Sequence, residues 1–117
     1  MTPLTLARGD VVLTRFPFTD LTGASLSPAV VVSQGQIGQD LVLAAISSVV
    51  RGTLAPTDYT VETTHPEFVL TGLRVTSVVW MHKFAAVERS VIVHRLGRLG
   101  PQLQAEVDRL LRIVLGL

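Results

Sequence analysis

Short, β-branched apolar runs alternate with segments rich in Gly, Pro and Asp along most of this chain. Runs of this length and composition are typical of β-strands, and the turn-forming residues between them end each strand. Many short strands at such spacing predict a small barrel or a strongly curved sheet. The expected strands are residues 9–16, 29–33, 41–48, 59–63, 74–82 and 90–99.

The period of the apolar residues changes after Pro101. From there they recur at helical spacing while charged residues occupy the other faces, which predicts an amphipathic helix from Pro101 to a stop at Gly116. Asp108 and Arg112 are spaced to form an i, i+4 ion pair on that helix. We expect the apolar stripe to cover the chain's own core rather than another subunit. Its members are Leu103, Val107, Leu110, Leu111 and Val114.

The composition favours a single folded domain over residues 1–117, because 48% of the residues are hydrophobic and only 16% are charged. No apolar run approaches the roughly 20 residues that cross a bilayer. The opening "MTPLTLARGD" also lacks the basic and apolar regions of a secretory signal. We therefore expect a cytoplasmic protein with no membrane contact.

A net charge of +1 means that any nucleic-acid binding must use a local patch.

Few residues offer metal or acid–base chemistry. The chain has no cysteine, and its three histidines are far apart in sequence, so we expect no metal site and no cofactor. His82 and His94 together would supply a general base and a general acid for RNA cleavage, but only the expected adjacency of their strands brings them near each other. Trp80 fits either stacking on a base or a place in the core or an interface.

The segments "RGDVVLTRFPFTDLTG", "SPAVVVS", "LAAISS" and "SVVWMHKFAAVERSVIVHRLGRL", followed by the terminal helix, resemble the MazF/PemK family of type II toxin–antitoxin toxins. Each string is weak alone, but their order and spacing together are specific, and they cover nearly the whole chain from Arg8. The resemblance implies a mostly β, SH3-like small barrel with a C-terminal α-helix. It also implies a homodimeric, metal-independent endoribonuclease that cuts single-stranded RNA and is neutralised by a cognate antitoxin.

The resemblance further implies a cleavage site between a loop and the end of the third strand. Family members usually end this loop in a basic residue followed by Arg-Pro, and have Thr or Ser at the strand end. Ser47 stands at the hydroxyl position, Ser27 replaces the arginine, and Ser25 replaces the further basic residue. A guanidinium grips a phosphate with two charge-assisted hydrogen bonds, whereas a serine offers one neutral donor. The expected RNA-contacting residues are Phe18, Thr19, Asp20, Thr22, Ser25 and Ser48.

Three functions stay open from the sequence. In the first, which we favour, the chain is a ribonuclease in which Arg15 or Arg51 supplies the cation that Ser27 lacks. In the second, the toxin fold binds RNA or a protein with little cleavage. In the third, it inhibits a topoisomerase, as the related plasmid toxin fold does. Fold alone does not choose between them, because function resides in the site.

A homodimer is also expected from the residues themselves. Val78, Val79 and Trp80 are predicted to expose more apolar strand surface than one helix covers.

Overall fold

The computed structural model describes residues 5–15, 26–48 and 53–117. A strand forms at every expected place, and the helix follows them. The elements in chain order are β1 (Asp10–Thr14), β2 (Ser27–Val31), β3 (Asp40–Ser47), β4 (Tyr59–Val61), the 3-10 turn η1 (Phe68–Thr71), β5 (Ser77–Glu88), the 3-10 turn η2 (Arg89–Val91), β6 (Ile92–Arg98) and α1 (Pro101–Leu115).

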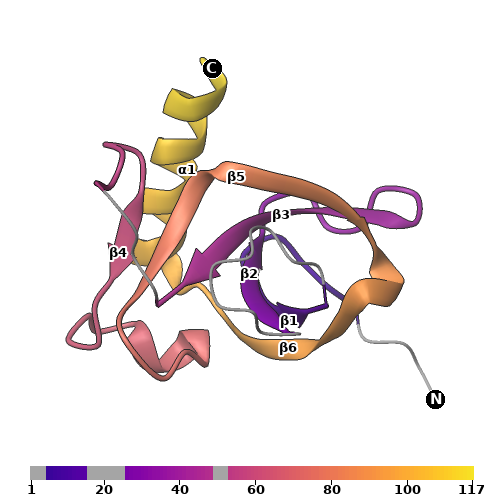
Figure 1. Cartoon of the computed structure of the whole chain (residues 1–117), viewed down its shortest axis with the longest axis horizontal. Coiled ribbons are helices and arrows are strands. Elements are labelled where there is room, and N and C mark those ends of the chain that lie inside the picture. The colour runs from indigo at the N-terminus through magenta and orange to yellow at the C-terminus, as the bar shows by residue number, and fades with distance from the viewer. Residues whose placement is uncertain (1–4, 16–25, 49–52) are drawn as a thin grey trace.

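The six strands form one antiparallel sheet in the order β4-β5-β3-β2-β1-β6. The sheet curls into a barrel-like shape, with the helix against one side (Figure 1). The barrel is not closed, because β4 and β6 are the two edges of the sheet in the described part of the chain. The predicted fold class, a mostly β barrel-like fold with a C-terminal helix, is confirmed.

β5 is longer than the sequence pattern predicted. It runs for 12 residues, from Ser77 to Glu88, whereas the pattern ended it at His82. Its second half contains Lys83 and two alanines and is partly exposed, so it lacks the apolar run that marks a buried strand. That half nevertheless pairs with β3, from Asp40 opposite Glu88 onward, with a shift in register after Ala44.

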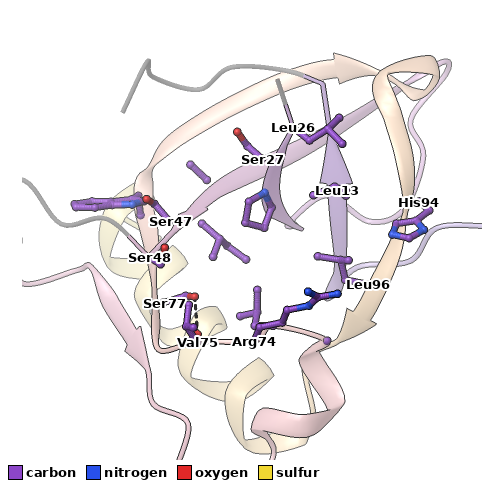
Figure 2. Close-up of a pocket in the computed structure, with 16 residues that line it drawn as sticks. Leu13, Leu26, Ser27, Ser47, Ser48, Arg74, Val75, Ser77, His94 and Leu96 are labelled. Atoms are coloured by element: carbon purple, nitrogen blue, oxygen red, sulfur yellow. Dashed lines mark hydrogen bonds between the residues drawn. The ribbon is translucent and has the colours of Figure 1, made fainter. Parts of the chain in front are cut away.

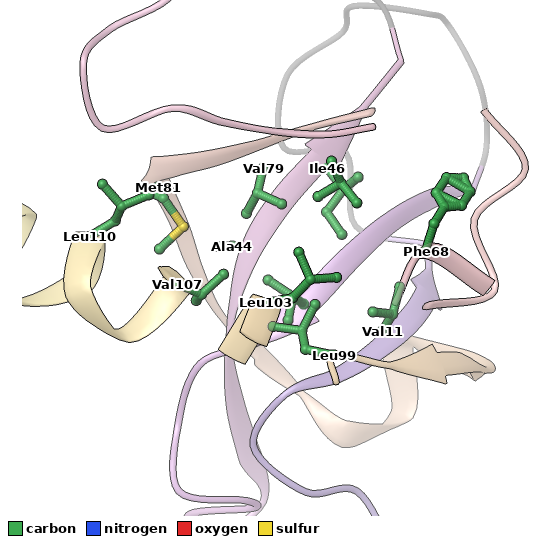
Figure 3. Close-up of a cluster of buried hydrophobic side chains, with 12 residues drawn as sticks. Val11, Ala44, Ile46, Phe68, Val79, Met81, Leu99, Leu103, Val107 and Leu110 are labelled. Carbon is green, nitrogen blue, oxygen red and sulfur yellow. The ribbon is translucent and has the colours of Figure 1, made fainter. Parts of the chain in front are cut away.

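α1 covers the open side of the sheet, as predicted. Its apolar stripe packs with side chains of β1, β3 and β5 in the main buried cluster (Figure 3). Pro101 opens the helix, and Gly116 ends it with a left-handed φ of 71°. The buried members of the stripe are Leu103, Val107 and Leu110.

The predicted ion pair between Asp108 and Arg112 is wrong. Asp108 instead accepts hydrogen bonds from the guanidinium of Arg8 and from the side-chain amide of Gln104. Arg8 lies 100 positions away in the sequence, and it reaches Asp108 because the N-terminal segment packs beside α1. A fork-shaped contact of this kind uses both carboxylate oxygens of Asp108.

The N-terminus of α1 is capped from a distant segment. Gly100 at the N-cap position has no side chain to accept a hydrogen bond. The carboxylate of Glu67 accepts the backbone N–H groups of Gln102 at 3.0 Å and Leu103 at 2.8 Å. Glu67 is only 7% exposed and directly precedes η1. The cap therefore ties the segment around η1 to the helix, and its negative charge suits the positive end of the helix dipole.

The expected exposure of Val78, Val79 and Trp80 is wrong, because these side chains are 3%, 1% and 5% exposed in the single chain. Val79 belongs to the buried cluster that includes α1, and Val78 and Trp80 pack with Ala45 and Leu54. These side chains therefore give no reason to expect a dimer. Large apolar side chains are exposed elsewhere, at Ile37, Val69, Ile113, Leu115 and Leu117.

None of the helices in the described ranges has the length and apolar character that crossing a bilayer would require.

Candidate active site

A cavity of about 500 Å³ opens where β2 begins and β3 ends. The start of β5, the middle of β6 and the segment after η1 complete its walls (Figure 2). The described residues that line it are Leu13, Leu26, Ser27, Pro28, Ala45, Ile46, Ser47, Ser48, Gly72, Leu73, Arg74, Val75, Ser77, Trp80, His94 and Leu96.

Strand pairing brings two of the predicted site residues together. β2 and β3 are antiparallel with Ala29 opposite Ala45. Ser27 and Ser47 lie two residues beyond this pair, on the same strand faces as Ala29 and Ala45, and both line the cavity. Ser48 follows at the rim and is exposed. Residues 20 positions apart in the sequence thus place hydroxyl groups on one cavity, as the resemblance implied.

Most of the cavity wall is apolar, and its described lining residues include basic side chains but no acidic ones. Arg74 and His94 line the cavity together with the serines, and no Asp or Glu is among the described lining residues. Such a pocket has hydrogen-bond donors and a permanent positive charge in surroundings of low polarity. Both features favour a ligand that combines an anionic group with a flat or apolar one.

Arg74 was missed in the sequence. It lies in the segment between η1 and β5, and nothing in its spacing connects it to Ser27 or Ser47. A weak signal was available, because Gly72 precedes it and a glycine often marks a close approach of two backbones. Gly72 has a φ of 74°, and a Cβ there would lie 2.2 Å from the carbonyl oxygen of Leu96 on β6. This contact holds the Arg74 segment against the cavity.

The other predicted site residues are not brought to the cavity by the described structure. Arg15 is exposed just after β1, where its backbone N–H donates to the carbonyl of Val91 at 3.0 Å, and it is not among the lining residues. The remaining predictions fall outside the described ranges and stay predictions. They are Phe18, Thr19, Asp20, Thr22, Ser25 and Arg51.

The expected adjacency of the strands that carry His82 and His94 is wrong. β5 and β6 are separated in the sheet by β3, β2 and β1, because β6 returns to pair with β1. His94 lines the cavity, whereas the Nδ1 of His82 lies 3.2 Å from the buried carboxylate of Asp58. The sheet order therefore gives no support to a histidine pair acting as base and acid.

Trp80 occupies a core position beside the cavity. It packs with Ala45, Val78 and the partly buried Leu54, and the ammonium group of Lys83 lies 4.7 Å from its ring centroid. Its indole Nε1 is buried and has no hydrogen-bond partner among the described residues. Of the two predicted roles for Trp80, the described contacts match the core position.

His, Asp and Glu side chains in the described ranges form no group of three or more that could hold a metal ion.

The sequence matches a known family over almost its whole length. The family described as PemK-like, MazF-like toxins of type II toxin–antitoxin systems matches residues 7–115. The chain belongs to this family. The match spans the sheet and the helix, so the cavity lies within a MazF-like domain. A search of curated proteins gives no match.

Several solved structures share the fold. A MazE–MazF structure from Deinococcus radiodurans has a TM-score of 0.72 at 20% identity, covering 98% of this chain and 99% of that one. An endoribonuclease in complex with its cognate antitoxin, from a mycobacterial species, has a TM-score of 0.69 at 20% identity and covers 96% of each chain. A mycobacterial endoribonuclease has a TM-score of 0.69 at 18% identity, covering 100% of this chain and 97% of that one.

Proposed function

We propose that this MazF-like protein is the toxin of a type II toxin–antitoxin system and acts in the cytoplasm as an endoribonuclease that cuts single-stranded RNA at a short sequence. The observation that carries the proposal is the cavity that Ser27, Ser47 and the guanidinium of Arg74 line together. Two structural neighbours are named endoribonucleases, which supports the proposed activity.

The cavity suits RNA cleavage through the substrate's own 2′-hydroxyl. In that reaction the 2′-oxygen attacks the adjacent phosphorus, the 2′-proton is removed, and the departing 5′-oxygen gains a proton. Negative charge grows on the phosphoryl oxygens, and hydroxyl and cationic donors fixed beside them stabilise it. The apolar wall offers room for an unstacked base, which a single strand presents more readily than a duplex.

A small antitoxin is the proposed protein partner. One structural neighbour is an endoribonuclease in complex with its cognate antitoxin, and another is a MazE–MazF structure. Since the present chain has the same fold and belongs to the same family, we infer that it too is held inactive by a cognate antitoxin.

A toxin-fold binding module with little cleavage is the second candidate, and one observation favours it. Ser27 lines the cavity at the position where the resemblance expects an arginine. Losing one preorganised donor to a transition-state oxyanion commonly lowers a rate by about 10²–10³-fold.

Inducible expression of the protein alone, followed by mapping of new RNA ends, separates these functions. Growth arrest with new ends at one short sequence is the expected result. Arrest without new RNA ends would overturn the nuclease and favour a different target. The empty vector supplies the background of natural ends.

We predict that cleavage needs no divalent metal. The nucleophile is the substrate's 2′-hydroxyl, so no metal ion is required to activate a water molecule. The purified protein should cut RNA at the same rate, within about twofold, in EDTA and in magnesium. Loss of activity in EDTA that one particular metal restores would contradict this prediction.

We also predict a homodimer. Its support is the family resemblance together with the exposed Ile37 and Leu115, which border an apolar groove that Phe84 and Leu111 also line. Sedimentation equilibrium at micromolar concentration should give about twice the chain mass of 12.6 kDa. A single species of one chain mass would reject the dimer.

A further inference from the structure

We propose that Arg74 is the catalytic cation of this protein and binds the scissile phosphate that Ser27 and Ser47 approach from the other wall of the cavity. The inference rests on the proposed ribonuclease function and names the residue that compensates for Ser27.

Arg74 supplies a permanent positive charge to the cavity. Among the described lining residues it is the sole Arg or Lys, and no carboxylate there competes for it. A phosphodiester that enters the cavity therefore meets, among the described residues, one permanent cation and the hydroxyl groups of the lining serines. The guanidinium is suited to this task because its planar fork donates two parallel hydrogen bonds to a phosphate.

The Arg74 side chain is available for a ligand. It is exposed, and it makes neither a hydrogen bond nor an ion pair with any residue in the described ranges. Other arginines are engaged: Arg8 with Asp108, Arg95 with Asp10, and Arg109 with Glu106. Figure 2 shows the Arg74 side chain extending toward Leu96 along the cavity, with Ser27 and Ser47 on the other side of it.

The backbone on both sides of Arg74 is fixed. The N–H of Leu73 donates to the hydroxyl of Thr71 at 3.1 Å, and that hydroxyl donates to the carbonyl of Phe68 at 2.7 Å. On the other side, the hydroxyl of Ser77 donates to the carbonyl of Val75 at 2.9 Å. A charged side chain on a backbone held in this way pays less ordering entropy when it binds its ligand.

Neighbouring elements hold the same segment from outside. Gly72 lies against the backbone of β6, so closely that a Cβ would meet the carbonyl of Leu96. Glu67, just before η1, is bonded to the first turn of α1. The segment that carries Arg74 is thus held against β6 at Gly72 and is connected, through Glu67, to the first turn of α1.

The proposal is tested by single-turnover cleavage of an RNA that the wild type cuts. Arg74→Ala should lower the rate by about 10²–10³-fold, because a cationic donor to the transition state is lost. Arg74→Lys should retain part of the rate, since it keeps the charge without the fork. Arg112→Ala removes an exposed arginine from α1 and is the matched control, expected to cleave within about twofold of wild type.

A second variant makes the test specific to the cavity. Ser27→Arg combined with Arg74→Ala returns a guanidinium to the opposite wall, and should recover at least about tenfold of the lost rate. Wild-type cleavage with Arg74→Ala within twofold of it would overturn the role of Arg74 and leave the proposed function standing. A wild type that leaves RNA intact would overturn the proposed function itself, and Arg74's role with it.

Discussion

Ser27→Arg is expected to raise the cleavage rate about ten- to hundredfold. The substitution places a second permanent cation in the cavity that Ser47 and Arg74 also line. An added charge-assisted contact to the phosphate strengthens transition-state binding by roughly 1–3 kcal/mol. The measurement is the single-turnover rate on an RNA that the wild type cuts.

Ser90→Arg is the control for this gain. Ser90 lies in η2 and is exposed, so the substitution adds the same charge to the protein without placing it in the cavity. Ser47→Ala should act in the opposite direction, because it removes a hydroxyl that we propose donates to the phosphate. If Ser27→Arg and Ser47→Ala both cleave within twofold of wild type while remaining folded, the two serines do not form the site.

Removing the Glu67 carboxylate is expected to destabilise the protein by about 3 kcal/mol, since two backbone N–H groups of α1 would lose a charged, buried acceptor. For a chain of this size, that corresponds to a fall in melting temperature of roughly 12 °C. Glu67→Ala followed by thermal unfolding measures the effect. Glu67→Gln should lose less, because an amide keeps one acceptor oxygen.

Glu88→Ala is the matched control for Glu67. Glu88 is an exposed glutamate at the end of β5, and its loss should change the free energy of unfolding by no more than about 0.5 kcal/mol. A Glu67→Ala protein that melts within 2 °C of wild type, as roughly expected for a surface change, would show that the cap contributes little.

The strands and the helix can be predicted from the sequence, because each depends on the pattern of its own residues. Short β-branched runs mark the strands, and the period change after Pro101 marks the helix, because both patterns follow from which face each element buries. The second half of β5 was missed since it is only half buried. The order of the strands is not local: the return of β6 to pair with β1 separates His82 from His94, and no residue spacing encodes it.

The residues of the candidate site also differ in how far the sequence predicts them. The family resemblance identifies Ser27 and Ser47, and the antiparallel pairing of β2 with β3 then explains why the start of one strand and the end of the other line one cavity. Arg74 and Glu67 act through tertiary contacts, one across a cavity and the other at the end of a helix 35 residues away. An arginine shortly after a glycine gives only a weak signal, and a lone glutamate in a loop carries no pattern that distinguishes it from a solvated surface residue.

The most direct test of the ribonuclease function is to sequence the RNA ends produced when the purified protein is incubated in EDTA with a long single-stranded RNA. The proposed function predicts ends at one short sequence, and their loss in Ser47→Ala protein that melts at the wild-type temperature. No new ends, or the same ends from wild type and Ser47→Ala, would contradict cleavage by this cavity.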